Sequence, residues 1–371
     1  VLDGGQIRAD LRADRTGGDI HVDVRETVRL SGVNGTGDDR AQSGLMARAD
    51  PTYTEAGVAG SIHVRAGRLE VLDGALISGS TLQTAADAGS ISVEVDGLLR
   101  LSGEAEGRYS EIAIRSGENG GGAGSIDLHA GRVEILEGTI VTASSLSDSP
   151  AGDIRIQADQ DVLIQGAGLN AESIAASTGG GIVLGARGQI SLVDSYIRTN
   201  VRRGEGSGGD IAIGVGDWPQ RLVLNRAEVI ANARQGDGGN IDISARYLLK
   251  SVDSGISASS REGVDGLISI NAPEVEVAGR VEPLPVSYLD VSALLQAHCA
   301  ARRDAGRSSF TIEGRPGTPP PLDGYLPSTP TPGGLAPGAA EPVPAQGGSV
   351  RSQLDGFDLG CGRDWRLAVR D

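Results

Sequence analysis

One short phrase recurs along most of this chain: Gly-Gly or Ala-Gly, then a variable residue, then Ile. Copies of its Ile stand at Ile7, Ile20, Ile62, Ile91, Ile126, Ile154, Ile182, Ile211 and Ile241, and a decayed last copy ends in Ile268. From residue 62 onward the intervals are 29, 35, 28, 28, 29, 30 and 27 residues, and the 42 residues between positions 20 and 62 indicate an insertion. A spacing of 20–50 residues is typical of solenoids and repeat arrays. The phrase therefore predicts stacked repeats in place of ordinary globular domains.

Each period reads as three short strands. In the copy that starts at Ile126, residues 126–129 alternate apolar and polar side chains, which is the period of a β-strand. A second alternating segment covers residues 132–135, and a third, at 138–141, closes the period. Three strands without helical spacing predict an all-β fold in which each period forms one coil of a parallel β-helix. At about 4.8 Å each, about nine coils make a rod on the order of 45 Å long. Longer loops at residues 31–51 and 117–122 read as places that tolerate insertion.

The composition agrees with a long, thin core. The 371 residues include 57 Gly and only 3% aromatic residues, so Ile, Val, Leu and Ala must supply most of the interior. The net charge of −16 argues against nucleic acid or an anionic membrane as a partner. No apolar run reaches the roughly 18 residues that a membrane helix needs, so we expect no membrane-spanning segment.

The repeats are predicted to end near residue 280. Residues 1–280 form β-helix repeats of about 28–30 residues, and residues 281–326 form a capping segment with one short helix at 292–303. Residues 327–350, rich in Pro and Gly, read as an extended linker, and residues 351–371 form a terminal segment with a cysteine. Because Val1 stands in the middle of a repeat, we expect the chain to be the C-terminal part of a longer precursor.

The repeats and the tail together resemble a known family. The coil pattern Gly-x-Ile-x-Ile, followed by Leu-x-Leu-x-x-Gly-Ala-x-Ile-Ser, is clearest at residues 59–80 and 123–144. The tail adds His298-Cys299, the segment Gly-Arg-Ser-Ser-Phe-Thr-Ile-Glu-Gly-Arg at 306–315, and three prolines at 319–321. This combination is similar to the filamentous-haemagglutinin-like exoproteins of two-partner secretion, although Pro316-Gly317 replaces a Gly-Gly pair of their usual ending. The resemblance covers about residues 4–326.

The resemblance implies a secreted adhesin with the fold of a right-handed parallel β-helix. It implies export to the cell surface of a Gram-negative-type bacterium through a partner β-barrel transporter of the outer membrane. The receptor, a host-cell or surface protein or glycan, is not indicated by the residues. Cys299 and Cys361 fit one disulfide or two free thiols. The family analogy suggests a C-terminal disulfide or plug that holds the rod at the transporter, and the alternative is a plain staple for the tail.

Parallel β-helices also carry polysaccharide-cleaving activities, so carboxylates on the outer strand faces must be weighed. The candidates at matching outward positions are Asp127, Arg155 and Asp242, flanked at the turns by Asp19, Asp153 and Asp210. Acid–base catalysis needs two carboxylates held close together with separated pKa values. These residues instead recur singly, one per coil, as a solvated face does, so we predict no catalytic residues. The alternatives to a structural adhesin are a polysaccharide-active lyase or hydrolase and the stalk of a contact-dependent toxin.

No metal or cofactor site is predicted either. His21 and His63 share the outward position after the marker Ile, but the insertion between them is expected to separate their coils. The spacing within residues 121–127 misses the calcium-binding β-roll repeat by one residue. The run Gly-Gly-Gly at 179–181 precedes a strand and lacks the lysine of a phosphate loop, so it reads as a turn that needs positive φ. His298 beside Cys299 is interpreted as the neighbour of a structural cysteine.

Overall fold

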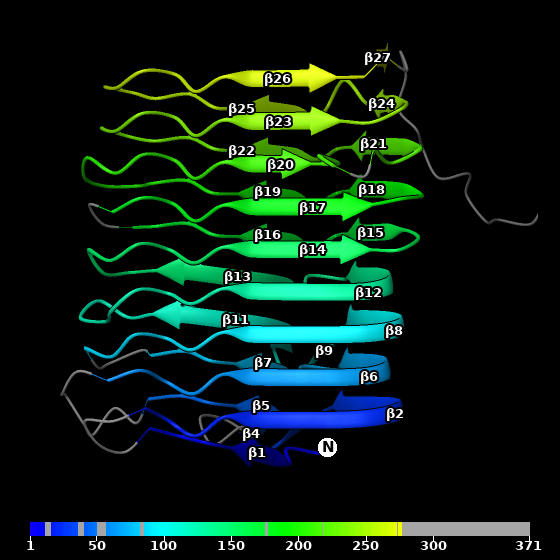
Figure 1. Cartoon of the computed structure of the whole chain (residues 1–371), viewed down its shortest axis with the longest axis vertical. Coiled ribbons are helices and arrows are strands. Elements are labelled where there is room, and N and C mark those ends of the chain that lie inside the picture. Colours follow the sequence, from blue (N-terminus) through cyan, green and yellow to red (C-terminus); the bar gives the residue numbers. More distant parts are fainter. Residues whose placement is uncertain are drawn as a thin grey trace, which may run out of the picture. The chain divides into compact units, whose positions relative to one another are not determined.

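The structure, a computed structural model, describes residues 1–11, 16–35, 41–49, 57–81, 85–174, 177–216, 218–272 and 274–276. These residues belong to a compact unit, Val1–Glu282. In this part the chain forms strands and turns with no helix, hence none that is long and apolar enough to cross a membrane. The strands stack turn upon turn as a parallel β-solenoid across the described residues (Figure 1). The predicted segments 281–326, 327–350 and 351–371 lie outside the described residues.

The larger sheet has 14 strands in the described part and wraps two faces of the solenoid. In the first turns, a single long strand runs over both faces. These strands are β2 (Ile20–Ser31), β6 (Ile62–Leu72), β8 (Ile91–Ser102) and β12 (Ile126–Leu136). In later turns, two strands replace each long one. The pairs are β14 (Ile154–Ala158) and β15 (Val162–Gln165), β17 (Ile182–Ala186) and β18 (Gln189–Val193), β20 (Ile211–Ile213) and β21 (Arg221–Asn225), β23 (Ile241–Ser244) and β24 (Leu248–Lys250), β26 (Ile268–Asn271) and β27 (Glu274–Glu276).

Corner length explains why the early turns have one strand where two were predicted. In β12 the corner between the two faces runs from Ala130 to Val133 and includes a glycine, and a register shift there keeps the ladder to β8 continuous. The next turn pairs these positions with Ala158 and Val162, which are one residue further apart. The turn after it has the same longer corner. The corner of β8, from Val95 to Leu99, is equally long, but it stacks between two shorter corners and β8 stays continuous. Where one longer corner stacks on another, the corner residues are left out of the ladder and each strand divides in two.

The third face is a parallel sheet of nine strands in the described residues. Its strands are β1 (Gln6–Arg8), β5 (Gly44–Met46), β7 (Leu76–Ser78), β11 (Glu111–Ser116), β13 (Ile140–Ser145), β16 (Gly168–Asn170), β19 (Tyr196–Arg198), β22 (Glu228–Ile230) and β25 (Gly255–Ser257). Followed upward from the N-terminus in Figure 1, the chain runs left to right along the near strands and returns along the fainter, more distant ones. A coil that advances in this way is right-handed, as the resemblance implied.

The register confirms the repeat phrase. From β2 to β26 each marker Ile pairs with the marker Ile of the next turn, beginning with Ile20 and Ile62. One copy was assigned wrongly: Ile7 pairs with Leu45, so its strand lies on the third face. Ile126 is fully buried, as are the inward residues on the other two faces of its turn, Ile135 and Val141. The core is the thin aliphatic column that the composition predicts.

The extra residues of the two long turns form antiparallel hairpins at the same corner, between the second and third faces. In the first, β3 (Val33–Asn34) pairs with β4 (Ala41–Gln42), which agrees with an insertion at residues 31–51. In the second, β9 (Glu104–Ala105) pairs with β10 (Arg108–Tyr109). The loop at 117–122 was therefore the wrong place for the second insertion. A hairpin satisfies its own backbone groups, so it interrupts neither stacked sheet.

Candidate functional site

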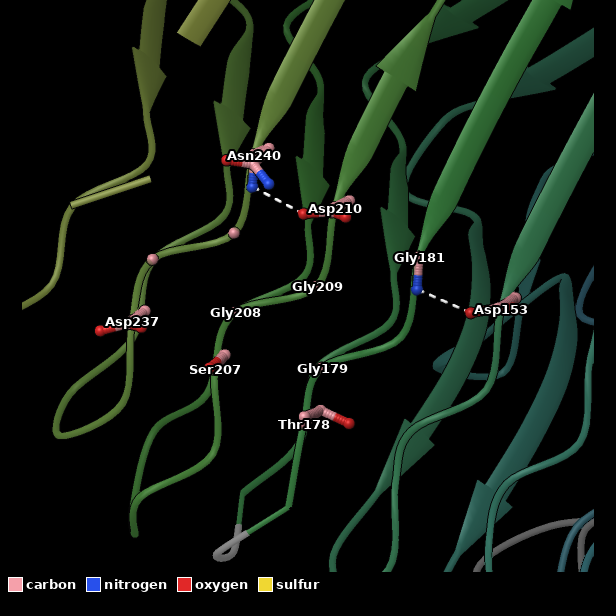
Figure 2. Close-up of a pocket in the computed structure, with 12 residues that line it drawn as sticks. Asp153, Thr178, Gly179, Gly181, Ser207, Gly208, Gly209, Asp210, Asp237 and Asn240 are labelled. Carbon is pink, nitrogen blue, oxygen red and sulfur yellow. Dashed lines mark hydrogen bonds between the residues drawn. The ribbon is translucent and has the colours of Figure 1, made fainter. Parts of the chain in front are cut away.

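The turns between the third and first faces form a recess of about 510 Å³, where several predicted candidates lie (Figure 2). Asp153 accepts a hydrogen bond through Oδ1 from the backbone N–H of Gly181 in the next turn, at 2.7 Å. Asp210 accepts one in the same way from the N–H of Asn240, also at 2.7 Å. Each carboxylate therefore accepts a hydrogen bond from a backbone N–H of the turn stacked on it. A capping side chain at the start of a helix accepts a backbone N–H in the same way.

The same arrangement recurs at both ends of the solenoid. Asp19 accepts from the N–H of Ser61 at 2.8 Å, and the amide oxygen of Asn240 accepts from the N–H of Leu267 at 3.0 Å. Asn240 replaces Asp at the equivalent position and keeps the acceptor, so a neutral amide oxygen serves there as well as a carboxylate. The recurrence of acidic residues at the turns is thus explained by turn-to-turn hydrogen bonding.

The glycines of the repeat phrase line this recess, and the predicted reason for them was wrong. None of Gly179, Gly180 and Gly181 has a positive φ. A Cβ on Gly180 would instead fall well inside 3.0 Å of the carbonyl oxygen of Gly152 in the preceding turn, closer than real Cβ atoms come. Gly209 stands against the carbonyl of Gly180 in the same way. Glycine is required because stacked backbones touch here.

On the outer side of the first face, the structure brings together two of the three outward candidates. Asp127 and Arg155 are register partners on β12 and β14, and Arg155 Nε lies 3.7 Å from Asp127 Oδ1. Asp242 is further along the stack, since Arg155 pairs with Val183, Val183 with Ala212, and Ala212 with Asp242. Asp242 is therefore outside any site built around Asp127.

A shallow groove of about 280 Å³ lies beside this pair. Its polar lining includes Glu94 and His129, which are register partners on β8 and β12. His129 Nε2 lies 3.9 Å from Asp159 Oδ1, and both side chains are about half exposed. Charged groups of both signs thus border an open groove on this face, which suits a polar ligand more than an apolar one.

The expected separation of His21 and His63 was wrong. The inserted hairpin loops out at the corner, so β2 and β6 stack directly and pair His21 with His63. The two exposed imidazole rings stack with centroids 4.8 Å apart and an interplanar angle of 8°. They line a groove of about 370 Å³. In the described part of the chain, no three His, Cys, Asp or Glu side chains come together as metal ligands.

Sequence reasoning missed a row of ion pairs on the second face. Arg29 Nη2 lies 2.6 Å from Glu70 Oε2, and Arg100 Nη2 lies 2.5 Å from Glu134 Oε2. Glu70 is only 6% exposed. Burial raises the pKa of Glu70, but hydrogen bonds from Arg29 and Arg68 outweigh it and hold the pKa below its usual value. The signal was present, because Arg and Glu alternate at one position of successive repeats.

A second unpredicted cluster surrounds a buried glutamate near the third face. Glu172 is 4% exposed, and its carboxylate accepts hydrogen bonds from Asn200 Nδ2 and Arg202 Nη2, each at 2.9 Å. Both donors belong to the next turn, so this carboxylate also links neighbouring turns. Asn170 donates to it at 3.2 Å from the same turn. The cluster is a satisfied polar network of the kind that fixes one register of stacking.

The remaining predicted positions, Cys299, Cys361 and His298, lie outside the described residues. No protein-family model, curated protein or solved structure matches this chain. The resemblance to the two-partner secretion exoproteins therefore depends on the repeat and tail motifs alone.

Proposed function

We propose that this chain is the rod of a secreted, non-catalytic surface adhesin, exported by two-partner secretion. The observation that carries the proposal is that polar residues of the repeats bind groups of neighbouring turns. The turn carboxylates such as Asp153 bind the backbone of the next turn, and Glu70 and Glu134 bind arginines of neighbouring turns. Polar chemistry that serves stacking favours a protein whose purpose is to extend and to present a surface.

Adhesion would use the residues that do not repeat. Loops and outer strand positions of a solenoid change without disturbing the stack, so they supply varied contacts on a rigid support. The hairpins β3–β4 and β9–β10 leave the stack at one corner and give that corner a distinct surface. The receptor is a protein or glycan of another surface.

Export would require an outer-membrane β-barrel transporter as partner. Cys299 and the three prolines at 319–321 match tail motifs of the resembling family, and a disulfide between Cys299 and Cys361 would hold the rod at that transporter. The net charge of −16 keeps an extended rod soluble and separate from anionic surfaces.

The test is fractionation of the native host together with mass analysis of the C-terminal peptides under reducing and non-reducing conditions. We expect the protein at the cell surface or in the medium, and its loss from both when the partner transporter is deleted. Cells without the chain should attach less well to surfaces and regain attachment on complementation. Reduced protein confined to the cytoplasm, or unchanged attachment, would overturn the proposal.

One observation favours the second candidate, a polysaccharide-active enzyme: Asp127 and Arg155 border the 280 Å³ groove. Asp127→Asn and Arg155→Gln would then abolish depolymerisation of an acidic polysaccharide, measured as release of reducing or unsaturated ends. Asp242→Asn is the matched control, since Asp242 has the same strand position away from the groove. Our proposal expects no depolymerisation by any of the four proteins, wild type included.

A further inference from the structure

We infer that His21 and His63 form a binding site for one divalent transition-metal ion, a site of the zinc, nickel or copper type. The two residues are register partners on β2 and β6, and their imidazole rings lie face to face with centroids 4.8 Å apart. Imidazole nitrogen is the preferred protein ligand of these metals, and the next position in the row is Ser92, which does not extend the pair.

Among the described residues, each of these two imidazole rings has only the other as a ring or polar partner. Neither ring makes a hydrogen bond or an ion pair with the described residues, and both side chains are exposed. His129 differs, because it stands on the same face but lies near Asp159 and has Glu94 and Gln157 as register partners. The pair is thus free to change ring orientation when a ligand arrives.

Small rotations convert the stacked pair into two ligands of one ion. Each Zn–N bond is about 2.0–2.1 Å, so two nitrogens on a tetrahedral ion lie about 3.3 Å apart. Rings held 4.8 Å apart in neighbouring strands reach that separation by tilting toward each other about their side-chain torsions. Water completes the coordination, since no third His, Cys, Asp or Glu of the described residues joins the pair.

The charged residues around the two histidines attract a cation moderately. Asp23 and Glu94 line the same groove, and Arg65 lies between them in the register and offsets part of their charge. The chain as a whole carries a net charge of −16, which raises the local concentration of cations. An ion with open positions on a surface is also able to accept a ligand from a second molecule.

The test is titration of the full chain, free of any polyhistidine tag, with Zn²⁺, Ni²⁺ and Cu²⁺ by calorimetry, with Mg²⁺ as the hard-cation control. The chain has four histidines, so each is replaced in turn: His21→Asn, His63→Asn, His129→Asn and His298→Asn. We expect one transition-metal ion per chain, with affinity lowered about tenfold or more, roughly 1.4 kcal/mol, in the first two variants only.

A second readout separates loss of ligands from loss of folding. Zn²⁺ should raise the thermal midpoint of the wild type and of His129→Asn, and leave that of His21→Asn and His63→Asn unchanged, because an ion that binds only the folded state stabilises it. Circular dichroism without metal should be the same in all variants. Unchanged affinity in His21→Asn and His63→Asn, equal loss in His129→Asn or His298→Asn, or no binding by the wild type would overturn the inference.

Discussion

Replacing Gly180 by alanine should destabilise the solenoid although the new side chain is one methyl group. The Cβ would stand about 1 Å closer to the Gly152 carbonyl oxygen than the 3.0 Å limit that real Cβ atoms observe. The atoms that this Cβ would meet first, the carbonyl oxygen and carbon of Gly152, belong to the backbone, so the clash cannot be relieved by moving a flexible side chain. Relief requires the two turns to separate, which strains the hydrogen bond that joins them, from the Ile154 N–H to the Gly181 carbonyl oxygen at 2.9 Å.

The magnitude follows from two opposed effects. Overpacking that forces backbone shifts costs about 1–3 kcal/mol. A Gly→Ala change without a clash stabilises by about 0.4–1 kcal/mol, because it restricts the unfolded chain. Gly255 is the matched control, since nothing lies within 4 Å of a Cβ there and its φ is not positive. The gain from restricting the unfolded chain is common to both variants, so we expect Gly180→Ala to be about 1–3 kcal/mol less stable than Gly255→Ala.

The assay is urea unfolding of the full chain, followed by circular dichroism, with hydrogen exchange to locate the effect. Stability in a solenoid is a sum of turn and interface contributions, so exchange should accelerate most in the turns next to residue 180. Equal midpoints for Gly180→Ala and Gly255→Ala would refute the claim that backbone contact selects glycine in the repeat phrase.

Three further changes test the core, the turn caps and the buried ion pairs. Ile156→Ala, at a fully buried position, should lower the free energy of unfolding by about 2–5 kcal/mol in urea, and a loss below 1 kcal/mol would contradict the tight packing. Asp153→Ala should cost about 0.5–1.5 kcal/mol and accelerate exchange of the Gly181 amide but not of the Asn240 amide. Because the pKa of Glu70 is lowered on folding, its stabilisation is present above the unfolded value of about 4.3 and lost as pH falls through the folded value. The difference in free energy of unfolding between wild type and Glu70→Gln should therefore become smaller in acid. A difference that does not depend on pH would contradict a stabilisation by the ionised Glu70 carboxylate.

The solenoid was predictable because one phrase repeats at a nearly constant interval. Alternation of apolar and polar residues identified the inward positions, and the pairing of Ile154 with Ile182, one regular interval apart, shows that the register was implied as well. Local pattern could not tell which sheet a short segment joins, since Ile7 follows Gly-Gly but pairs with Leu45. Nor could it show that the corner at Ala130 keeps one strand continuous, because that depends on the corner of the neighbouring turn.

The candidate site was less predictable for a related reason. The turn carboxylates were identified, but their partners are backbone groups about one period away, such as the N–H of Gly181 for Asp153. His21 lies beside His63 only because the extra residues between Ile20 and Ile62, which are 42 residues apart, do not separate their two strands. The β3–β4 hairpin places extra residues of this interval outside the stacked sheets. From the length of the interval alone, β2 and β6 were expected not to be neighbours.

Repetition and function place opposite demands on the outer positions of this chain. The glycine that appears in every turn is explained by stacking, and so are the carboxylates of Asp153 and Asp210, because they contact or bind the backbone of a neighbouring turn. A binding site on a solenoid must break that regularity, since a ligand contacts a few turns and not all of them. His21 and His63 break it, with Ser92 and then Asp127 at the same position of the following turns. The residues that depart from the repeat are therefore the ones to mutate first when a ligand of this protein is sought.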